Sequence, residues 1–201
     1  MISLHDAAVW QPSHTTTPLP GRDDRIKSAA ERIRDQARTG FSPVLLPYLM
    51  PGQQNKDFHQ LPQWYRKTLK LVKESNEFRS AEAIIDLLGA GPGLTPSGDD
   101  VILGLLLTMN RWKHLISMSR NHDHFNQQIV AAAYQRTTTL SANLIECAAQ
   151  ELADRRLIKA LDWLIAGTGN GIGVINELLT WGSSSGADAF VGFLIALSPG
   201  E

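Results

Sequence analysis

The sequence predicts a mainly α-helical fold, a compact helical bundle with a central pair of apolar helices. Most segments repeat their apolar residues with helical spacing, and nothing after residue 20 shows the alternation of a sheet strand. Two segments, 101–109 and 189–197, are apolar on nearly every side, which is typical of helices at the centre of a core. With 201 residues, of which 43% are hydrophobic, the chain has enough apolar material to fill that core.

The chain divides into a short N-terminal part, residues 1–22, and a helical domain, residues 23–201. The first part is expected to hold a short strand over residues 2–10, followed by an extended linker rich in Pro and Thr. Residues 41–52 hold three prolines in an apolar setting, so we expect an irregular, packed connection there. Apolar spacing and flanking glycines predict helices over residues 25–39, 61–77, 81–88, 99–117, 125–134, 141–153, 157–166, 174–181 and 187–197.

Charge and cysteine content argue against several classes of protein. The formal net charge is −1 and the isoelectric point is near 6.6, whereas nucleic-acid-binding proteins normally carry a basic surface. The single cysteine, Cys147, cannot form an intramolecular disulfide, which fits a reducing compartment. No signal peptide is visible, and the longest apolar stretches are about half the length of a membrane-spanning helix. We expect a soluble, cytoplasmic protein that binds neither nucleic acid nor a membrane.

The stretch GAGPGLTPSGDD, residues 89–100, is the best candidate for a functional site because it opens into a buried helix. A helix N-terminus presents unpaired backbone N–H groups and a partial positive charge, which suit a phosphate or a carboxylate. Ser97 is expected to cap this helix, with an acid three residues later in the arrangement of a capping box. The ligand-binding candidates in this stretch are Gly91, Gly93, Thr95, Ser97 and Gly98.

Two adjacent acids, Asp99 and Asp100, are the catalytic candidates. Two carboxylates repel an anion unless a cation such as Mg²⁺ lies between them, or unless they bond to amino groups of the ligand. No cofactor or metal site is assigned from the residues, and Asp99 and Asp100 are the expected ligands if Mg²⁺ binds. The structural alternative is a well-capped helix in which both acids only complement the helix dipole.

The candidate stretch is repeated later in the chain. Four residues each have a counterpart of the same type at the same distance farther along the chain. They are Ser97, Gly98, Asp100 and a helix glycine. The helix glycine is Gly104, and the second set is Ser185, Gly186, Asp188 and Gly192. Serine, glycine and aspartate at these positions suit a helix start, and each helix glycine lets another helix approach closely. Two such helix starts, if they face each other, would form a small polar chamber with Asp100 near Asp188, and the alternative is a chance match between two short segments. Further ligand-binding candidates are Ser185, Gly186 and Asp188.

A third group of hydroxyl side chains lies at residues 137–141. As another wall of the same site, Thr138 and Ser141 are expected to donate hydrogen bonds to the ligand. Taken alone, this group is better explained as a helix N-cap with spare hydroxyls.

Three motifs resemble a bacterial domain family of unknown function that includes a subunit of oxamate carbamoyltransferase, an enzyme of anaerobic allantoin and purine degradation. They are GPGLTPSGDD at 91–100, TTTLSANLIECAA at 137–149 and SSSGADAFVGFLIAL at 183–197, within a resemblance that spans about residues 81–197. The resemblance implies that the family site lies at the residues selected above. It also implies a reaction that moves a carbamoyl group between phosphate and oxamate, together with two other protein types, one of them similar to an acyl-CoA synthetase.

Members of that family usually carry a longer N-terminal part, rich in β-structure, and only residues 1–12 resemble its end. Residues 1–22 are therefore interpreted as a remnant of this part. A strand left without partners seeks pairing, so the chain could form a homo-oligomer through it.

Three functions remain open. The first is an enzyme subunit, related to carbamoyltransferases, that binds a small carboxylate, carbamoyl or phosphate compound. The second is a non-catalytic assembly subunit whose loop docks a partner protein, which predicts an exposed apolar patch beside residues 89–97. The third is a structural remnant without activity. We rank them in this order, with little separation between the first two.

Overall fold

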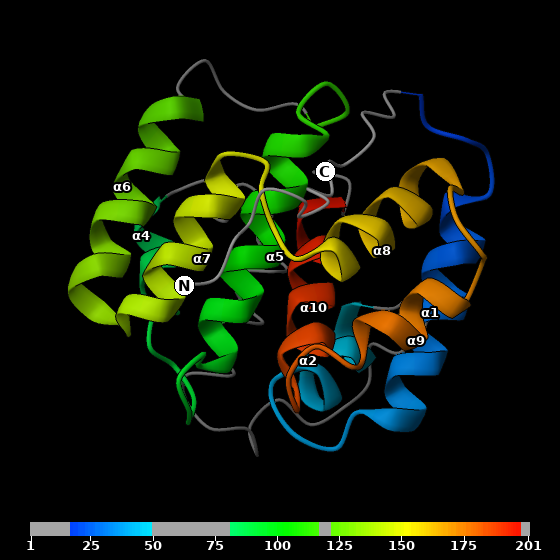
Figure 1. The fold of residues 1–201 in the computed structure, drawn as a ribbon, viewed down its shortest axis with the longest axis horizontal. Coiled ribbons are helices and arrows are strands. Elements are labelled where there is room, and N and C mark those ends of the chain that lie inside the picture. Colours follow the sequence, from blue (N-terminus) through cyan, green and yellow to red (C-terminus); the bar gives the residue numbers. More distant parts are fainter. Residues whose placement is uncertain (1–16, 50–80, 117–121, 198–201) are drawn as a thin grey trace, which may run out of the picture.

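The computed structural model describes residues 17–49, 81–116 and 122–197. Every regular element in these ranges is an α-helix (Figure 1), so the predicted mainly α class is confirmed for them. The strand predicted over residues 2–10 and the helix predicted over residues 61–77 lie outside the described residues.

The helices largely follow the predicted order, with bounds that differ by a few residues. They are α1 (Arg22–Gln36), α2 (Ser42–Leu49), α4 (Ala81–Ile85), α5 (Ser97–Arg111), α6 (His122–Arg136), α7 (Thr139–Ala149), α8 (Arg155–Ala166), α9 (Gly173–Leu178) and α10 (Ser185–Leu197). In Figure 1, α5 and α10 lie in the middle, with α4, α6 and α7 on one side and α1, α8 and α9 on the other. Among the described residues, no helix is long and apolar enough to cross a membrane.

The central pair, α5 and α10, is packed backbone against backbone. Every residue of α5 is buried, as are nearly all residues of α10. A Cβ atom on Gly104 would lie 2.0 Å from the carbonyl oxygen of Ala189, and one on Gly192 would lie 2.1 Å from that of Val101. Both glycines are therefore required by the close approach of the other helix, as the repeated motif predicts.

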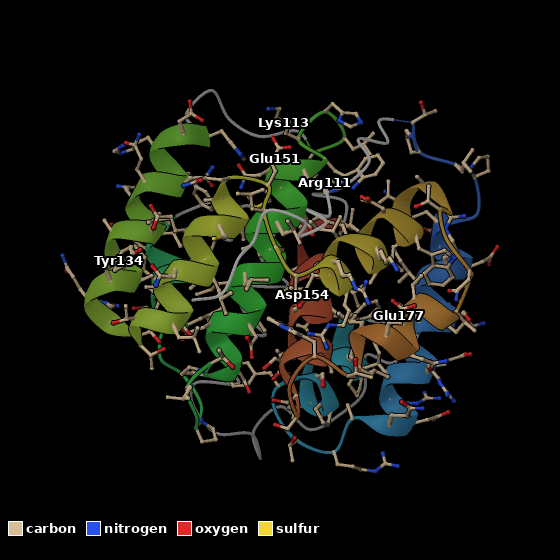
Figure 2. The ribbon with its side chains drawn as sticks, viewed as in Figure 1. Arg111, Lys113, Tyr134, Glu151, Asp154 and Glu177 are labelled. Atoms are coloured by element: carbon tan, nitrogen blue, oxygen red, sulfur yellow. The ribbon has the colours of Figure 1, made fainter. Side chains whose placement is uncertain are left out.

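The far end of α5 is fixed by a buried ion pair. Arg111, at the C-terminal end of α5 (Figure 2), donates two hydrogen bonds of 2.7 Å to the carboxylate of Asp162 in α8. Trp112 adds a third, from its indole N–H at 3.1 Å. A bidentate arginine–carboxylate pair fixes both distance and orientation, so it holds α5 against α8.

The prediction of an irregular connection over residues 41–52 is wrong, because residues 42–49 form α2. Pro43 lies in the first turn, where no backbone N–H is needed, although Pro47 removes one hydrogen bond farther along. The start of α2 is held from outside. Asp188 of α10 accepts hydrogen bonds from the backbone N–H groups of Phe41, at 2.7 Å, and Ser42, at 2.8 Å. A cap supplied from another helix stabilises a segment that its own sequence pattern does not favour.

Replacing Gly104 by alanine is expected to lower the free energy of unfolding by about 3 kcal/mol, because its Cβ has no room beside the neighbouring backbone. Gly171→Ala is the matched control, because no described atom lies within 4 Å of its Cβ position and only its left-handed backbone opposes alanine. The control should lose about 1 kcal/mol. Urea unfolding followed by circular dichroism measures both changes, and equal losses would contradict the assigned contact.

Candidate functional site

The two repeated helix starts meet in space. The hydroxyl of Ser185, the first residue of α10, hydrogen-bonds to Asp100 in the first turn of α5. The hydroxyl of Ser97, the first residue of α5, hydrogen-bonds to Asp188 in the first turn of α10. The Oγ1 atom of Thr95 lies 3.2 Å from the Oγ atom of Ser185. The first residue of each helix therefore serves the aspartate of the other, and the two junctions form one buried polar cluster.

The predicted capping role of Ser97 is wrong. The N-cap of α5 is Pro96, and no side chain accepts a hydrogen bond at this cap. Ser97 is itself helical and directs its hydroxyl to Asp188 instead. The capping box with Asp100 is absent for the same reason. A buried carboxyl group is a stronger acceptor than water and needs donors, so it draws the hydroxyl away from its own helix.

Asp100 is the more perturbed acid of the cluster. The residue is 1% exposed, and its Oδ2 atom has no hydrogen-bond partner in the described structure. The pKa of Asp100 is raised from 3.8 to about 8, mainly by burial; the Ser185 hydroxyl opposes this rise, and the charges of Asp188 and Asp99 add to it. At neutral pH the Asp100 side chain is therefore mostly an uncharged carboxylic acid.

Asp188 is fully buried but better supplied with donors. Its pKa is raised from 3.8 to about 6 because burial outweighs its hydrogen bonds, which come from the Ser97 hydroxyl, the backbone N–H groups of Ser42 and Phe41, and the Ser184 hydroxyl. Gly40 has a left-handed φ of 82°, and a Cβ there would lie 2.3 Å from Oδ2 of Asp188. Asp188 is thus mostly ionised at neutral pH, and it joins α10 to the start of α2.

Asp99 occupies a separate position beside this cluster. Its Oδ1 atom accepts a hydrogen bond of 2.8 Å from the backbone N–H of Gly89. Its Oδ2 atom accepts one from the hydroxyl of Thr137. Both carboxylate oxygens are therefore in use, and Asp99 joins the turn before α5 to the turn between α6 and α7.

Thr138 and Ser141 hold the loop that precedes α5. Both hydroxyls donate to the carbonyl oxygen of Leu94, at 2.6 Å and 3.3 Å. Thr138 is also the N-cap of α7 and accepts from the backbone N–H of Ser141 at 3.1 Å. These bonds leave the Leu94 side chain 73% exposed, so the predicted third wall positions an exposed loop.

Glycine is required at the positions of the candidate site for two different structural reasons. Gly91 and Gly93, with φ of 118° and 99°, adopt a backbone conformation that other residues rarely take. Gly98 and Gly186 are needed for packing, since a Cβ on either would lie 2.1 Å from a carbonyl oxygen, of Leu87 and Leu178 respectively.

Sequence reasoning missed the contribution of residues 40–42 to this site. A signal was present, because Ser42 followed by Pro43 is a common way for a helix to begin. The partner of that helix start is Asp188, far along the chain, and no local pattern connects the two.

The contribution of Asp100 and Asp188 to the free energy of unfolding should fall as pH rises from about 4 to about 8. Both groups bind a proton more tightly in the folded protein, so this contribution is complete below the unfolded pKa and is lost through each folded pKa. Each proton gives a slope of at most about 1.4 kcal/mol per pH unit. Asp100→Asn should remove the slope between pH 6 and 8, as measured by urea unfolding at each pH. An unchanged slope in the variant would rule out a buried, protonated Asp100.

Residues 87–197, more than half of the chain, match the family model described as oxamate carbamoyltransferase subunit AllH. The matched region holds the paired helix starts and the Thr138 loop contact. No solved structure matches the chain. The family match covers both helix starts and their facing aspartates, though not residues 40–42, and the chain belongs to the oxamate carbamoyltransferase subunit AllH family.

Proposed function

We propose that this chain is the subunit of oxamate carbamoyltransferase that holds a small carboxylate, carbamoyl or phosphate compound at the paired starts of α5 and α10. One observation carries the proposal. Asp100 and Asp188 each keep one buried carboxyl oxygen, Oδ2, without a hydrogen-bond partner in the described structure. Buried polar groups are nearly always satisfied, so two such oxygens at one junction favour a ligand that bonds to them.

The charge state of the junction favours the same function. Helix N-termini attract anions, and two helices begin here. Two ionised acids would oppose an anion, but a protonated Asp100 leaves Asp188 as the one charged acid of the facing pair. The hydroxyl oxygens of Thr95, Ser97 and Ser185 lie at the same place and can accept hydrogen bonds from a ligand N–H group. We assign Asp99 a supporting role, since both of its oxygens are already bonded.

A Mg²⁺ ion would have to use few protein ligands here. Among the described residues, no group of three or more His, Cys, Asp and Glu side chains is arranged to hold a metal. Mg²⁺ is often bound by one or two carboxylates together with water and substrate oxygens. Asp100 and Asp188, rather than Asp99, would then be its ligands, because they retain the unused oxygens.

A second candidate function, assembly of the enzyme, is favoured by the exposed loop before α5. Leu94 is 73% exposed, and Leu140, beside the hydroxyls that hold the Leu94 carbonyl, is 48% exposed. Exposed leucines on a rigidly held loop suit a protein contact. The protein that contacts this loop would be another subunit of the enzyme. Because of the family resemblance, the subunit similar to an acyl-CoA synthetase is the first to test.

Calorimetry with oxamate, oxalurate and carbamoyl phosphate, each with and without Mg²⁺, tests the ligand site. At least one compound should bind, and Ser185→Ala should weaken it about tenfold because a hydrogen-bonding hydroxyl of the site is lost. Ser183→Ala is the matched control, since this exposed serine lies in the same loop and should leave binding unchanged. The titrations are run on the chain alone and with the other subunits. No binding under any of these conditions would refute the ligand site.

Leu94→Ser should weaken co-purification with the other subunits, because it removes the most exposed leucine of the loop without touching the buried cluster. Leu152→Ser is the control, since Leu152 is 51% exposed and lies beyond the opposite end of α7. Size-exclusion chromatography of the mixed subunits measures the effect. Equal behaviour of the two variants would exclude the loop as a specific assembly contact.

A further inference from the structure

We propose that Asp100, as an uncharged carboxylic acid, recognises the carbamoyl end of the ligand through a pair of hydrogen bonds. Its O–H donates to the ligand carbonyl oxygen, and its other oxygen accepts from the ligand –NH₂ group. This inference rests on the proposed function, since it assigns one end of the proposed ligand to one residue.

Asp100 and Asp188 occupy matching positions on their helices but differ in their hydrogen-bond donors. Asp188 receives two backbone N–H donors from the start of α2, in addition to hydroxyl groups. Asp100 occupies the matching position on α5 and receives the Ser185 hydroxyl, but no described backbone N–H donates to its carboxyl group. Both N–H groups from α2 donate to Oδ1 of Asp188, and the Oδ2 atoms of both acids have no partner among the described residues. Within the described part of the chain, Asp100 thus lacks the backbone donors that Asp188 has, and a ligand that brings its own N–H group would supply one.

Within residues 17–49, 81–116 and 122–197, the helices that pack around Asp100 bring no positive charge to it. No Lys, Arg or His occurs in α2, in α10, or in the first two turns of α5 and α7. Among the described residues, the ionisable groups that act on Asp100 are Asp188 and Asp99, and both disfavour its ionised form. A buried carboxyl without a counter-charge keeps its proton, so Asp100 can donate a hydrogen bond at neutral pH.

The carboxylic acid of Asp100 and the carbamoyl group of the ligand have complementary hydrogen-bonding groups. A primary amide presents an N–H donor beside a carbonyl acceptor, and a carboxylic acid presents an O–H donor beside a carbonyl acceptor. The two groups therefore fit each other with two parallel hydrogen bonds. A carboxylate in place of the amide offers acceptors alone and leaves one oxygen of Asp100 unpaired. A site built in this way should reject oxalate relative to oxamate, which differ only by this group.

The test compares oxamate with oxalate by calorimetry, on the chain together with the other subunits. The original protein should bind oxamate at least about tenfold more tightly. Asp100→Ala should abolish this preference. Asp100→Asn should keep it, because an amide side chain also has one donor face and one acceptor. Asp123→Asn, at an exposed aspartate in the first turn of α6, is the matched control and should behave like the original protein.

A pH series separates this role from mere packing. The oxamate affinity of the original protein should fall above pH 8, by up to about tenfold per pH unit, because ionised Asp100 no longer donates. The affinity of Asp100→Asn should stay level over the same range. This comparison also decides the matter if Asp100→Ala does not fold.

The outcomes distinguish the two proposals. Equal binding of oxamate and oxalate by the original protein, or the same fall with pH in Asp100→Asn, would overturn the role of Asp100 and leave the ligand site standing. No binding of either compound, with or without the other subunits, would overturn the proposed function itself.

Discussion

The rest of the structure depends on the direct backbone contact between α5 and α10. Two glycines, Gly104 and Gly192, remove the side chains that would keep these helices apart. The contact lies one to two turns inside each helix, so it also brings the two helix starts together. Once they are together, each first-turn aspartate loses contact with water and depends on the other helix for a hydroxyl donor. Packing at the core and chemistry at the site are therefore two results of one close approach.

Much of this arrangement could be predicted from the sequence, because it depends on a short segment that occurs twice in the chain. Apolar patterning predicted the central pair, and the matching Ser-Gly-x-Asp segments with their helix glycines suggested a facing arrangement without showing that Asp100 meets Asp188. Periodicity placed most helices to within a few residues. It failed at α2, where prolines argue for a connection and the stabilising cap comes from Asp188. It also misassigned Ser97, because a local capping rule cannot anticipate a buried acceptor on another helix.

The three aspartates at this junction have different structural roles. Asp99 joins two turns, Asp188 fixes a third helix, and Asp100 retains an unused oxygen. Sequence alone ranks adjacent Asp99 and Asp100 together as catalytic candidates. The side chains of neighbouring residues in a helix point about 100° apart, however, and here they reach different partners. The pairing that matters is across the helix interface, between Asp100 and Asp188.

The cap on α2 has a consequence for the order of folding. The hydrogen bond between Phe41 and Asp188 joins residues separated by 147 positions, most of the length of the chain. A short helix with two prolines has little tendency to form alone. Its first stable turn must wait until α10 has docked against α5 and presented its carboxylate. The segment that begins early in the chain is thus among the last to become native, and its contacts should slow unfolding more than they speed folding.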